Sequence, residues 1–485
     1  MARSTPPPSR RGPSSKGSKP RPVPKPAATD RPAQPQRPVQ RTPRGKTMPA
    51  LAALISTLAP RVVRDVLDRG KRLESAIVDA QGEDAKKRST RSDRRLVNQS
   101  LASLVRWWGW IEPLRLVQVE DQLLLAWLLD STELSAVPRI WASKAAKDYS
   151  RLSCGGDAPN WTARAETLKR FVAGRAVAAD PWMNFPAWIR DELPLPPGDE
   201  SPKIRRLQFL HAVQQPPSLW VAVRGETPKP VWDELREAGH KPWVQRRIES
   251  AARLERDADL RPIEAFTRGA LIVEDLASQA VAKVCDPDPG ERWWDLGEGS
   301  SLHATALADE MRGKGTVVTT FEHEPARRAA ALKIRNSPFR NIAAKAWDGR
   351  HAPGKPGTFD GVLVAPPNSG VGSWRRHPEM RWIVKKEQIA DFAARQRHAL
   401  ELAATAVRPG GTIVYTVGTA TLRETQTLIN EFLQARPEFR LDPFPHPLED
   451  EETSGTVQLW PQIHDCEARF IARLIRTAKP AAGAE

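Results

Sequence analysis

The chain has 485 residues, which is enough for two or three domains that each bury a core and argues against a single compact domain. Its formal charge of +16 and its pI near 10.0 favour a polyanionic partner such as nucleic acid, because Lys and Arg displace counterions from phosphates. Three widely spaced cysteines argue against a structural zinc site and a disulfide framework and favour a reducing cytoplasm, and the lack of a long apolar run argues against a membrane span. We also expect a monomer that binds no metal.

Residues 1–48 are rich in Pro, Ser, Lys and Arg and contain almost no large apolar residues. The first 50 residues hold 12 Lys or Arg against one acid, Asp30. Such a segment cannot repay its ordering entropy by burial, so we predict a disordered basic tail. It would tether RNA or only keep the protein soluble; a transit peptide is a third interpretation, which the prolines oppose. Residues 479–485 are predicted to form a second, short tail.

Residues 49–158 show the spacing of an amphipathic helical bundle, with apolar residues three and four positions apart. The segment from Ser92 to Ile111 resembles the helical module of the antiterminator NusB, and that resemblance implies an all-α, RNA-binding domain. Three aromatic residues, Trp107, Trp108 and Trp110, stand at the end of this segment. They could stack on bases, but aromatic residues at a helix end more often belong to the core.

Residues 159–258 give mixed signals. Residues 184–193 (NFPAWIRDEL) indicate the start of a helix, and residues 218–224 (SLWVAVR) indicate a short strand. We therefore predict a small α/β connector.

Residues 259–478 alternate between buried strands and helical runs such as PARRAAALKIRN. The predicted strands are the segments ERWWDLG, GTVVTTFE, FDGVLVAPP and GGTIVYTVG. Strands that alternate with helices favour an α/β domain with a doubly wound parallel sheet of the Rossmann type.

Candidate cofactor ligands follow three of these strands. Asp295 lies near the end of the first strand, where small residues precede a helix and would let backbone amides approach a ligand. Glu322 ends the next strand, where a carboxylate can accept hydrogen bonds from a ribose diol, and Asp348 could meet an adenine amino group. A tight turn in any α/β protein is the simpler alternative. The predicted cofactor-binding residues are Asp295, Gly297, Glu298, Gly299, Ser300, Ser301, Leu302, His303, Glu322 and Asp348.

Several segments between about Pro49 and Arg476 together resemble one protein family. They are PAWI (186–189), GALIVEDLASQAVA (269–282), FDGVLVAPPNSGVGSWRRHPEMRW (359–382) and RPGGTIVYTVGTATLRETQTLINEFL (408–433). These segments resemble the RsmB/NOP/Sun family of S-adenosylmethionine-dependent RNA (cytosine-5) methyltransferases. The resemblance implies a class I methyltransferase domain that uses S-adenosylmethionine on structured ribosomal or transfer RNA.

The chain departs from the family where the chemistry is done. The family's first motif reads DLCAAPGGKT, whereas this chain reads DLGEGSSLHA, which is closer to the general methyltransferase pattern DxGxG. The family's nucleophilic cysteine is replaced by Gly418 and its second cysteine by Asn368, and the carboxylate that should grip the base is replaced by Ala365. Carbon 5 of cytosine is a poor nucleophile until a thiolate adds to carbon 6, so cytosine-5 catalysis is in doubt.

The segment RRHP in the predicted substrate loop matches the family and suggests an RNA-facing edge. Arg375 and Arg376 could bind phosphate, and His377 could stack on a base; a solvated basic turn is the alternative. By their sequence placement, Cys154, Cys285 and Cys466 are not expected near this loop.

Three functions remain open from the sequence: an RNA methyltransferase with altered chemistry, an inactive RNA-binding relative in ribosome or RNA maturation, and a scaffold that needs neither RNA nor cofactor. The segment APPN also resembles the DPPY-type loop of amino-methylating enzymes, without its leading polar residue and its aromatic residue. The basic tail and the RRHP segment disfavour the scaffold.

Overall fold

The computed structural model describes residues 45–82, 89–131, 135–144, 160–173, 175–297 and 301–477. Arg44–Glu485 form one compact unit. The predicted tail at 479–485, nearly all of the tail at 1–48, and Cys154 lie outside the described residues. No helix in the described ranges is both long and apolar enough to cross a membrane.

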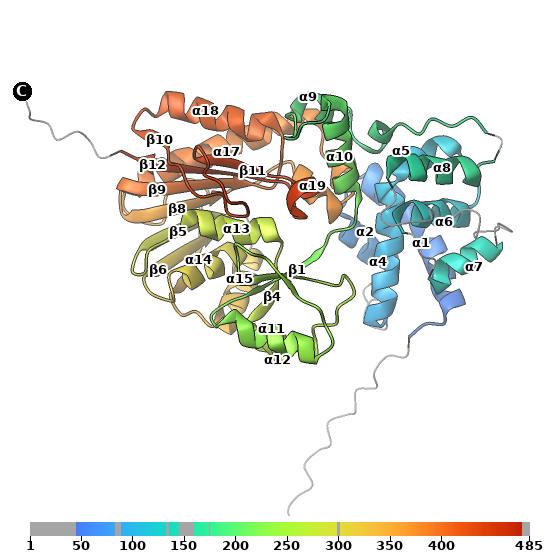
Figure 1. Ribbon diagram of the computed structural model, residues 1–485, viewed down its shortest axis with the longest axis horizontal. Coiled ribbons are helices and arrows are strands. Elements are labelled where there is room, and N and C mark those ends of the chain that lie inside the picture. The colour runs from blue at the N-terminus through green and yellow to red at the C-terminus, as the bar shows by residue number, and fades with distance from the viewer. Residues whose placement is uncertain are drawn as a thin grey trace, which may run out of the picture. The chain divides into compact units, whose positions relative to one another are not determined.

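The first part of the unit is the helical bundle that the apolar spacing predicts (Figure 1). Its elements are α1 (Met48–Leu67), α2 (Leu73–Gln81), α4 (Arg91–Arg106), α5 (Trp108–Ile111), η1 (Glu112–Leu114), α6 (Val119–Asp130), α7 (Ala136–Lys144) and α8 (Trp161–Phe171). A capping box starts α4, in which Asp93 N donates to Thr90 Oγ1 and Thr90 N donates to Asp93 Oδ2, each at 3.1 Å. Every residue of α6 from 123 to 129 is buried, so this helix forms the centre of the bundle.

Two observations refine the predictions for the bundle. Trp107 and Trp110 are fully buried with ring centroids 5.4 Å apart, so the core interpretation of these tryptophans is confirmed; Trp108 is partly buried against the same core. Leu168 and Phe171 of α8 pack into this core as well. The bundle therefore continues past residue 158, because α8 hides its apolar face against α6 rather than in the connector.

The connector is built around a small antiparallel sheet with strand order β2-β3-β1-β4. Its elements are η3 (Pro181–Asn184), α9 (Ile189–Glu192), α10 (Pro202–Gln214), β1 (Leu219–Val223), α11 (Pro228–Glu237), β2 (Trp243–Val244), β3 (Ala251–Leu254), α12 (Glu264–Thr267) and β4 (Leu271–Val273). The predicted strand at 218–224 is β1. The predicted boundary at residue 258 is too early, because β4 pairs with β1.

The C-terminal part holds an eight-stranded sheet. Its elements are α13 (Leu276–Cys285), β5 (Arg292–Gly297), α14 (Leu302–Glu310), β6 (Thr316–Phe321), α15 (Glu324–Asn336), β7 (Ile342–Ala346), β8 (Phe359–Ala365), η4 (Val371–Arg375), α16 (Met380–Ile383), α17 (Lys386–Ala406), β9 (Val407–Val417), η5 (Leu422–Glu424), α18 (Gln426–Ala435), β10 (Phe439–Leu441), β11 (Thr456–Leu459), α19 (Pro461–His464) and β12 (Arg469–Arg476). All four predicted strands are present.

The predicted α/β domain with a Rossmann-type sheet is confirmed, but the sheet is mixed, because an antiparallel strand that the prediction of a parallel sheet did not include joins it. Strands β7, β6, β5, β8 and β9 run parallel in that order, whereas β12 runs antiparallel to β9, and β10 and β11 run antiparallel to β12. Strand β10 follows β9 through helix α18 and runs parallel to it, and β12 is inserted between these two strands in the antiparallel direction. Strand order reverses beside β5, where open α/β sheets bind ligands.

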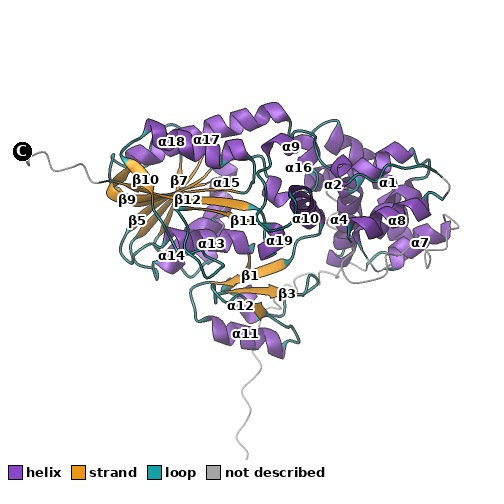
Figure 2. Ribbon diagram, turned by 45° about the horizontal axis from the view of Figure 1, so that its top comes forward, coloured by secondary structure: helices purple, strands orange, loops and turns teal. Residues whose placement is uncertain are grey.

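Helices cover both faces of this sheet, which lies between α13 and α14 on one side and α17 and α18 on the other (Figure 2). Two consecutive tryptophans of β5 divide between the faces: Trp293 packs with the core under α13 and α14, and Trp294 packs with the core under α17 and α18. Alternation along a strand points successive side chains to opposite faces. The strand is therefore buried on both sides, as its apolar run predicts.

Hydrogen bonds fasten the helical bundle to the loop that follows β8. Trp382 Nε1 donates to the carbonyl oxygen of Val105 at 2.9 Å, and Arg106 Nη2 donates to the carbonyl oxygen of Arg375 at 3.1 Å. Gln214 Nε2 of the connector donates to the carbonyl oxygen of Arg106 at 3.0 Å. The bundle, the connector and the loop after β8 are thus connected to one another around Arg106.

Candidate active site

A cavity of about 750 Å³, here called pocket A, opens at the carboxyl ends of β5, β6 and β8. Its walls include Gly297, Glu322, Trp347, Gly349 and Pro366. This is the crevice in which a doubly wound sheet binds its ligands. Two of the predicted cofactor residues, Gly297 and Glu322, therefore lie together.

Glycines make room for a ligand and for a carboxylate in pocket A. A Cβ atom at Gly297 would lie 3.1 Å from Asp295 Oδ1, and one at Gly349, where φ is +74°, would lie 3.2 Å from Glu322 Oε1. Within the described residues, the Glu322 carboxylate accepts no hydrogen bond, so both oxygens can receive the hydroxyls of a ribose. Trp347 adds an aromatic wall. These features fit a nucleoside cofactor.

Asp295 lies beneath the Gly297 backbone and is almost completely buried. Its Oδ2 accepts a hydrogen bond from Thr319 Oγ1 at 2.9 Å, whereas Oδ1 has no partner. Burial raises the pKa of Asp295 to about 7, although the Thr319 hydrogen bond acts in the opposite direction. An unpartnered buried oxygen next to the glycine turn is the position from which a carboxylate can meet a polar group of a bound ligand.

The structure does not bring every predicted cofactor residue into pocket A. The Asp348 carboxylate accepts hydrogen bonds from the amides of Arg350 and His351 at 2.9 and 3.0 Å and contacts His351 Nδ1 at 2.6 Å, which holds the pKa of Asp348 well below its usual range. It stabilises its own turn and does not line the pocket. Ser301 and Leu302 begin α14 without lining it either, and residues 298–300 lie outside the described residues.

A second cavity of about 300 Å³, here called pocket B, shares Gly297 and Pro366 with pocket A. The three positions at which the chain departs from the family, Ala365, Asn368 and Gly418, all line it. The structure thus brings together the residues that the resemblance assigned to the reacting base. His303 was predicted to bind the cofactor but lines pocket B instead. Burial, reinforced by Arg469, lowers the pKa of His303 to about 3, so its ring is neutral.

The loop positions in pocket B are ordered by their own hydrogen bonds. Asn368 Oδ1 accepts from the amide of Gly370 at 3.0 Å, and its Nδ2 donates to the carbonyl oxygen of Pro366 at 3.3 Å. A Cβ atom at Gly418 would lie 3.8 Å from both Arg469 Nη2 and Asn368 Oδ1. Asn368 therefore shapes the loop, and Gly418 leaves open space at the family's nucleophile position.

Sequence reasoning missed three charged residues of pocket B: Arg72, Glu467 and Arg469. Arg72 precedes α2 in the helical bundle, and its Nε lies 3.5 Å from Glu379 Oε1. Glu467 and Arg469 lie at the start of β12, where Arg469 Nη1 donates to Thr416 Oγ1 at 3.4 Å. The sequence signal was present, because two charges alternate with apolar residues at the start of a buried strand.

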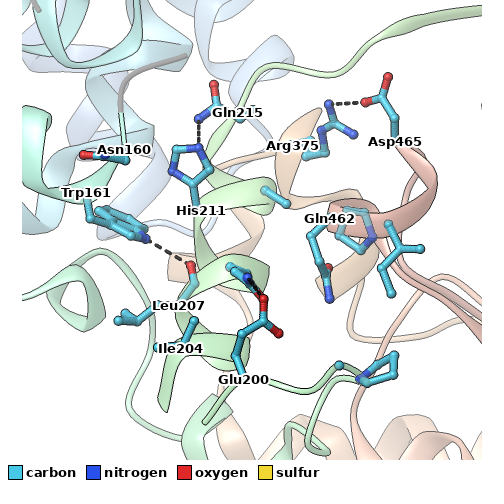
Figure 3. Close-up of a pocket in the computed structure, with 16 residues that line it drawn as sticks. Asn160, Trp161, Glu200, Ile204, Leu207, His211, Gln215, Arg375, Gln462 and Asp465 are labelled. Atoms are coloured by element: carbon cyan, nitrogen blue, oxygen red, sulfur yellow. Dashed lines mark hydrogen bonds and ion pairs between the residues drawn. The ribbon is translucent and has the colours of Figure 1, made fainter. Parts of the chain in front are cut away.

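The RNA-facing prediction fails for Arg375. The residue is 5 % exposed, and its Nη2 lies 3.0 Å from Asp465 Oδ1 and 3.3 Å from the carbonyl oxygen of Pro216. Figure 3 shows Arg375 directed at Asp465 at one end of another cavity, which is also lined by Trp161 and His211. A buried, paired guanidinium holds the loop in place and is not available to a phosphate. Its neighbours Arg376 and His377 are 45 % and 39 % exposed in their side chains and remain candidates for RNA contact.

The cysteines offer no substitute nucleophile in the described part of the chain. Cys285 and Cys466 are buried in the core under α13 and α14, and burial raises the pKa of both thiols well above the usual range. The expectation that no cysteine lies near the substrate loop is wrong for the backbone of Cys466, whose carbonyl oxygen lies 3.5 Å from Arg375 Nη1. Its Sγ points to the carbonyl oxygen of Glu467 and not into pocket B.

One cluster of side chains has residue types that bind metals, but the hydrogen bonds of its histidines do not suit metal ligation. His446, Glu449 and His464 place ligand atoms within 4.8 Å of one another. However, His446 Nδ1 accepts from the amide of Glu449 at 2.9 Å, and His464 Nδ1 accepts from the amide of Trp460 at 3.0 Å. The neutral rings therefore carry their protons on Nε2, whereas a ligating histidine donates its other N–H to an acceptor. The cluster stabilises turns.

Comparisons with known proteins agree with this geometry. Residues 282–475 match the family model of the 16S rRNA methyltransferases RsmB/F. Rv1407 of Mycobacterium tuberculosis (strain H37Rv), which carries only a provisional name as a methyltransferase, is 35 % identical over 43 % of this chain and 46 % of its own length. Ribosomal RNA small subunit methyltransferase B of Erwinia tasmaniensis is 26 % identical over 56 % of this chain and 62 % of its own length.

The chain thus spans about half the length of the curated relatives it matches. The crystal structure of PH0851 superposes with a TM-score of 0.66 and 20 % identity, covering 89 % of this chain and 100 % of that chain, which establishes a shared fold. Over residues 282–475 the C-terminal domain is thus similar to the RsmB/F family of methyltransferases.

Proposed function

We propose that this protein is an RNA methyltransferase that binds S-adenosylmethionine in pocket A and a nucleotide of structured ribosomal or transfer RNA in pocket B. The observation that carries the proposal is the junction of the two pockets at Gly297 and Pro366. A methyl donor and its acceptor must meet at about 3–3.5 Å for transfer. Two cavities that share part of one wall can bring them that close, and neither pocket alone would suffice.

The chain's own residues supply what the cofactor needs. Glu322 would accept hydrogen bonds from the ribose hydroxyls, and Gly297 would let the backbone approach the ligand. Asp295, with one unpartnered oxygen, lies directly below that backbone. S-adenosylmethionine, when bound, supplies an electrophilic methyl group, and its use is in keeping with the family of the matched domain.

Two observations support RNA as the partner. Relatives that match this chain carry the name of ribosomal RNA small subunit methyltransferases. Half-exposed cationic side chains, Arg72 and Arg376, stand beside pocket B, and the chain carries a formal charge of +16. We further propose that the bundle is the NusB-like RNA-binding domain and that the basic tail adds affinity.

An inactive RNA-binding protein is the second candidate, and Gly418 and Asn368 favour it because neither side chain can add to carbon 6 of cytosine. Isothermal titration with S-adenosylmethionine separates an intact cofactor site, which the enzyme requires, from a vestigial one. The proposed enzyme binds the cofactor, and Glu322→Ala weakens binding roughly ten- to a hundredfold, as expected for lost hydrogen bonds worth about 1.5–3 kcal/mol. Absence of binding by the parent protein would remove pocket A as a cofactor site and leave the inactive candidate.

A further inference from the structure

The chemistry of pocket B is set by which side chains line it. No cysteine lies among its described lining residues, so no thiolate can convert a cytosine ring into an enamine there. A nitrogen or oxygen atom of a nucleotide has its own lone pair and needs no such activation. Such an atom needs only a group that takes its proton as the methyl group arrives.

One lining residue has the form of that group. Glu467 is 7 % exposed as a residue, and it lies in the wall of pocket B at the edge of β12. Its Oε1 lies 3.2 Å from Arg376 Nε as an ion pair, but the angle is too poor for a hydrogen bond, and Oε1 has no hydrogen-bond partner. Glu467 is thus a buried carboxylate in the wall of pocket B that an ion pair holds near Arg376, and buried carboxylates are normally hydrogen-bonded as well.

We propose that pocket B takes an RNA nucleotide that presents an N–H or O–H group, and that Glu467 is the catalytic base that accepts its proton during methyl transfer. This inference rests on the proposed function of pockets A and B. The lone pair of the nucleotide nitrogen or oxygen forms the new bond to the methyl carbon. The carbon–sulfur bond of the donor breaks, and its electron pair stays on sulfur. The proton of the nucleotide passes to a Glu467 oxygen.

The surroundings of Glu467 suit a base. Burial, together with the carboxylate of Asp275, raises the pKa of Glu467, while Arg376, Arg469 and His377 oppose the rise. A carboxylate with a raised pKa accepts a proton more readily near neutral pH. The missing side chain at Gly418 adds room, and the volume of about 300 Å³ is at the small end of ligand pockets, as a single base or ribose requires.

The test uses the full-length protein, tritiated S-adenosylmethionine, and total RNA from a host strain that lacks this protein. We expect label in a nucleoside that is methylated on nitrogen or oxygen. Glu467→Gln should lower the rate about 10²–10⁴-fold, the usual contribution of a general base. Glu237→Gln on the exposed face of α11 is the matched control and should leave the rate unchanged.

A second readout does not depend on turnover. With S-adenosylhomocysteine present, affinity for the same RNA in its unmethylated form should rise with pH as Glu467 ionises, and Glu467→Gln should remove that rise. Label in 5-methylcytidine would overturn the inference. So would no label, or an unaffected Glu467→Gln variant, in protein that binds S-adenosylmethionine by titration. Loss of cofactor binding in the parent protein would instead remove the proposed function itself, so the two failures are distinguishable.

Discussion

Arg375 Nη2 lies 3.0 Å from Asp465 Oδ1, which ties the loop after β8 to the turn before β12. Asp465 also accepts hydrogen bonds from Ser218 Oγ and from Arg253 Nη1, each at 2.8 Å. Despite burial, the hydrogen bonds and charges of Arg253, Arg375 and Ser218 hold the pKa of Asp465 below its usual range. One carboxylate therefore joins the connector, the loop after β8 and the turn before β12.

Replacing Arg375 should affect stability more than RNA binding. Arg375→Ala removes a charged hydrogen bond at a partly exposed carboxylate, so the free energy of unfolding should fall by about 2 kcal/mol in urea titrations. Arg376→Ala, one residue along, should weaken RNA binding, because the Arg376 side chain is 45 % exposed beside pocket B. If Arg375→Ala lowered RNA affinity and left the free energy of unfolding unchanged, the prediction that Arg375 binds an RNA phosphate would be supported.

Asp295 should make stability depend on pH. Its pKa is about 7 in the folded chain and 3.8 in the reference state, so between these values the folded protein holds a proton that the unfolded chain has lost. Stability is therefore lost as pH rises from about 4 to about 7 and levels off above, by at most about 4 kcal/mol. Asp295→Asn removes this loss. Urea titrations give the free energy of unfolding of both proteins, and the value for Asp295→Asn minus that for the parent should be larger at pH 8 than at pH 5. An equal difference at the two pH values would contradict the assignment.

Arg72 makes the helical bundle part of pocket B, so its replacement should weaken RNA binding without destabilising the fold. Its side chain is 47 % exposed, which makes its ion pair with Glu379 a minor contributor to stability. Arg72→Ala should lower RNA affinity roughly tenfold and reduce the log–log salt slope by about one. Arg69→Ala, whose 60 % exposed side chain pairs with Asp65 outside the pocket, is the control and should change neither quantity.

The pattern of apolar residues along short segments was enough to predict individual strands and helices. Strands β5 and β9 were visible because strands buried on both faces are continuous apolar runs, and helices α1 and α4 were visible from their spacing. The direction of β12 was not, because it depends on which strand lies beside it and on the length of the connection, neither of which is written in the strand itself.

Some residues of the candidate site could be predicted from local sequence and others could not. Gly297 and Glu322 share a wall because carboxyl ends of adjacent parallel strands meet, which the strand order makes predictable. Glu467 reaches the pocket only because β12 pairs with β9, so the alternation of charged and apolar residues around it could not show which site these charges belong to. The prediction that Arg375 contacts RNA failed because arginines are usually exposed, whereas this guanidinium is buried by pairing with Asp465, 90 positions away in the sequence.

Deleting residues 1–48 should test the basic tail independently of either pocket. The deletion removes most of the excess positive charge that the sequence carries near its start. If several of these cations contact phosphates at once, the log–log slope of RNA affinity against salt should fall by several units, with no change in sequence preference. Filter binding at a series of salt concentrations measures the slope. Equal slopes for the full-length and shortened proteins would make the tail a solubilising segment.

The protein should form no covalent bond to cytosine. RNA that contains 5-azacytidine traps enzymes at the stage of the thiolate adduct, and Gly418 and Asn368 provide no thiolate in pocket B. The unmodified protein should therefore migrate free of such RNA on a denaturing gel. Trapping that Cys466→Ala abolished would identify a relocated nucleophile and contradict the burial of that thiol in the core.

The converse experiment rebuilds the family's residues. Gly418→Cys should fold, because a Cβ atom there meets only ordinary contacts at 3.8 Å, but it should not trap RNA alone. Adding Asn368→Cys and Ala365→Asp restores the release group and the base-gripping carboxylate, and only this triple variant should begin to trap. A thiol must lie about 3–3.5 Å from carbon 6, and an error of about 1 Å can cost roughly a hundredfold in rate. Trapping by Gly418→Cys alone would show that pocket B already positions a cytosine correctly, which would contradict a pocket shaped for an N–H or O–H nucleophile beside Glu467.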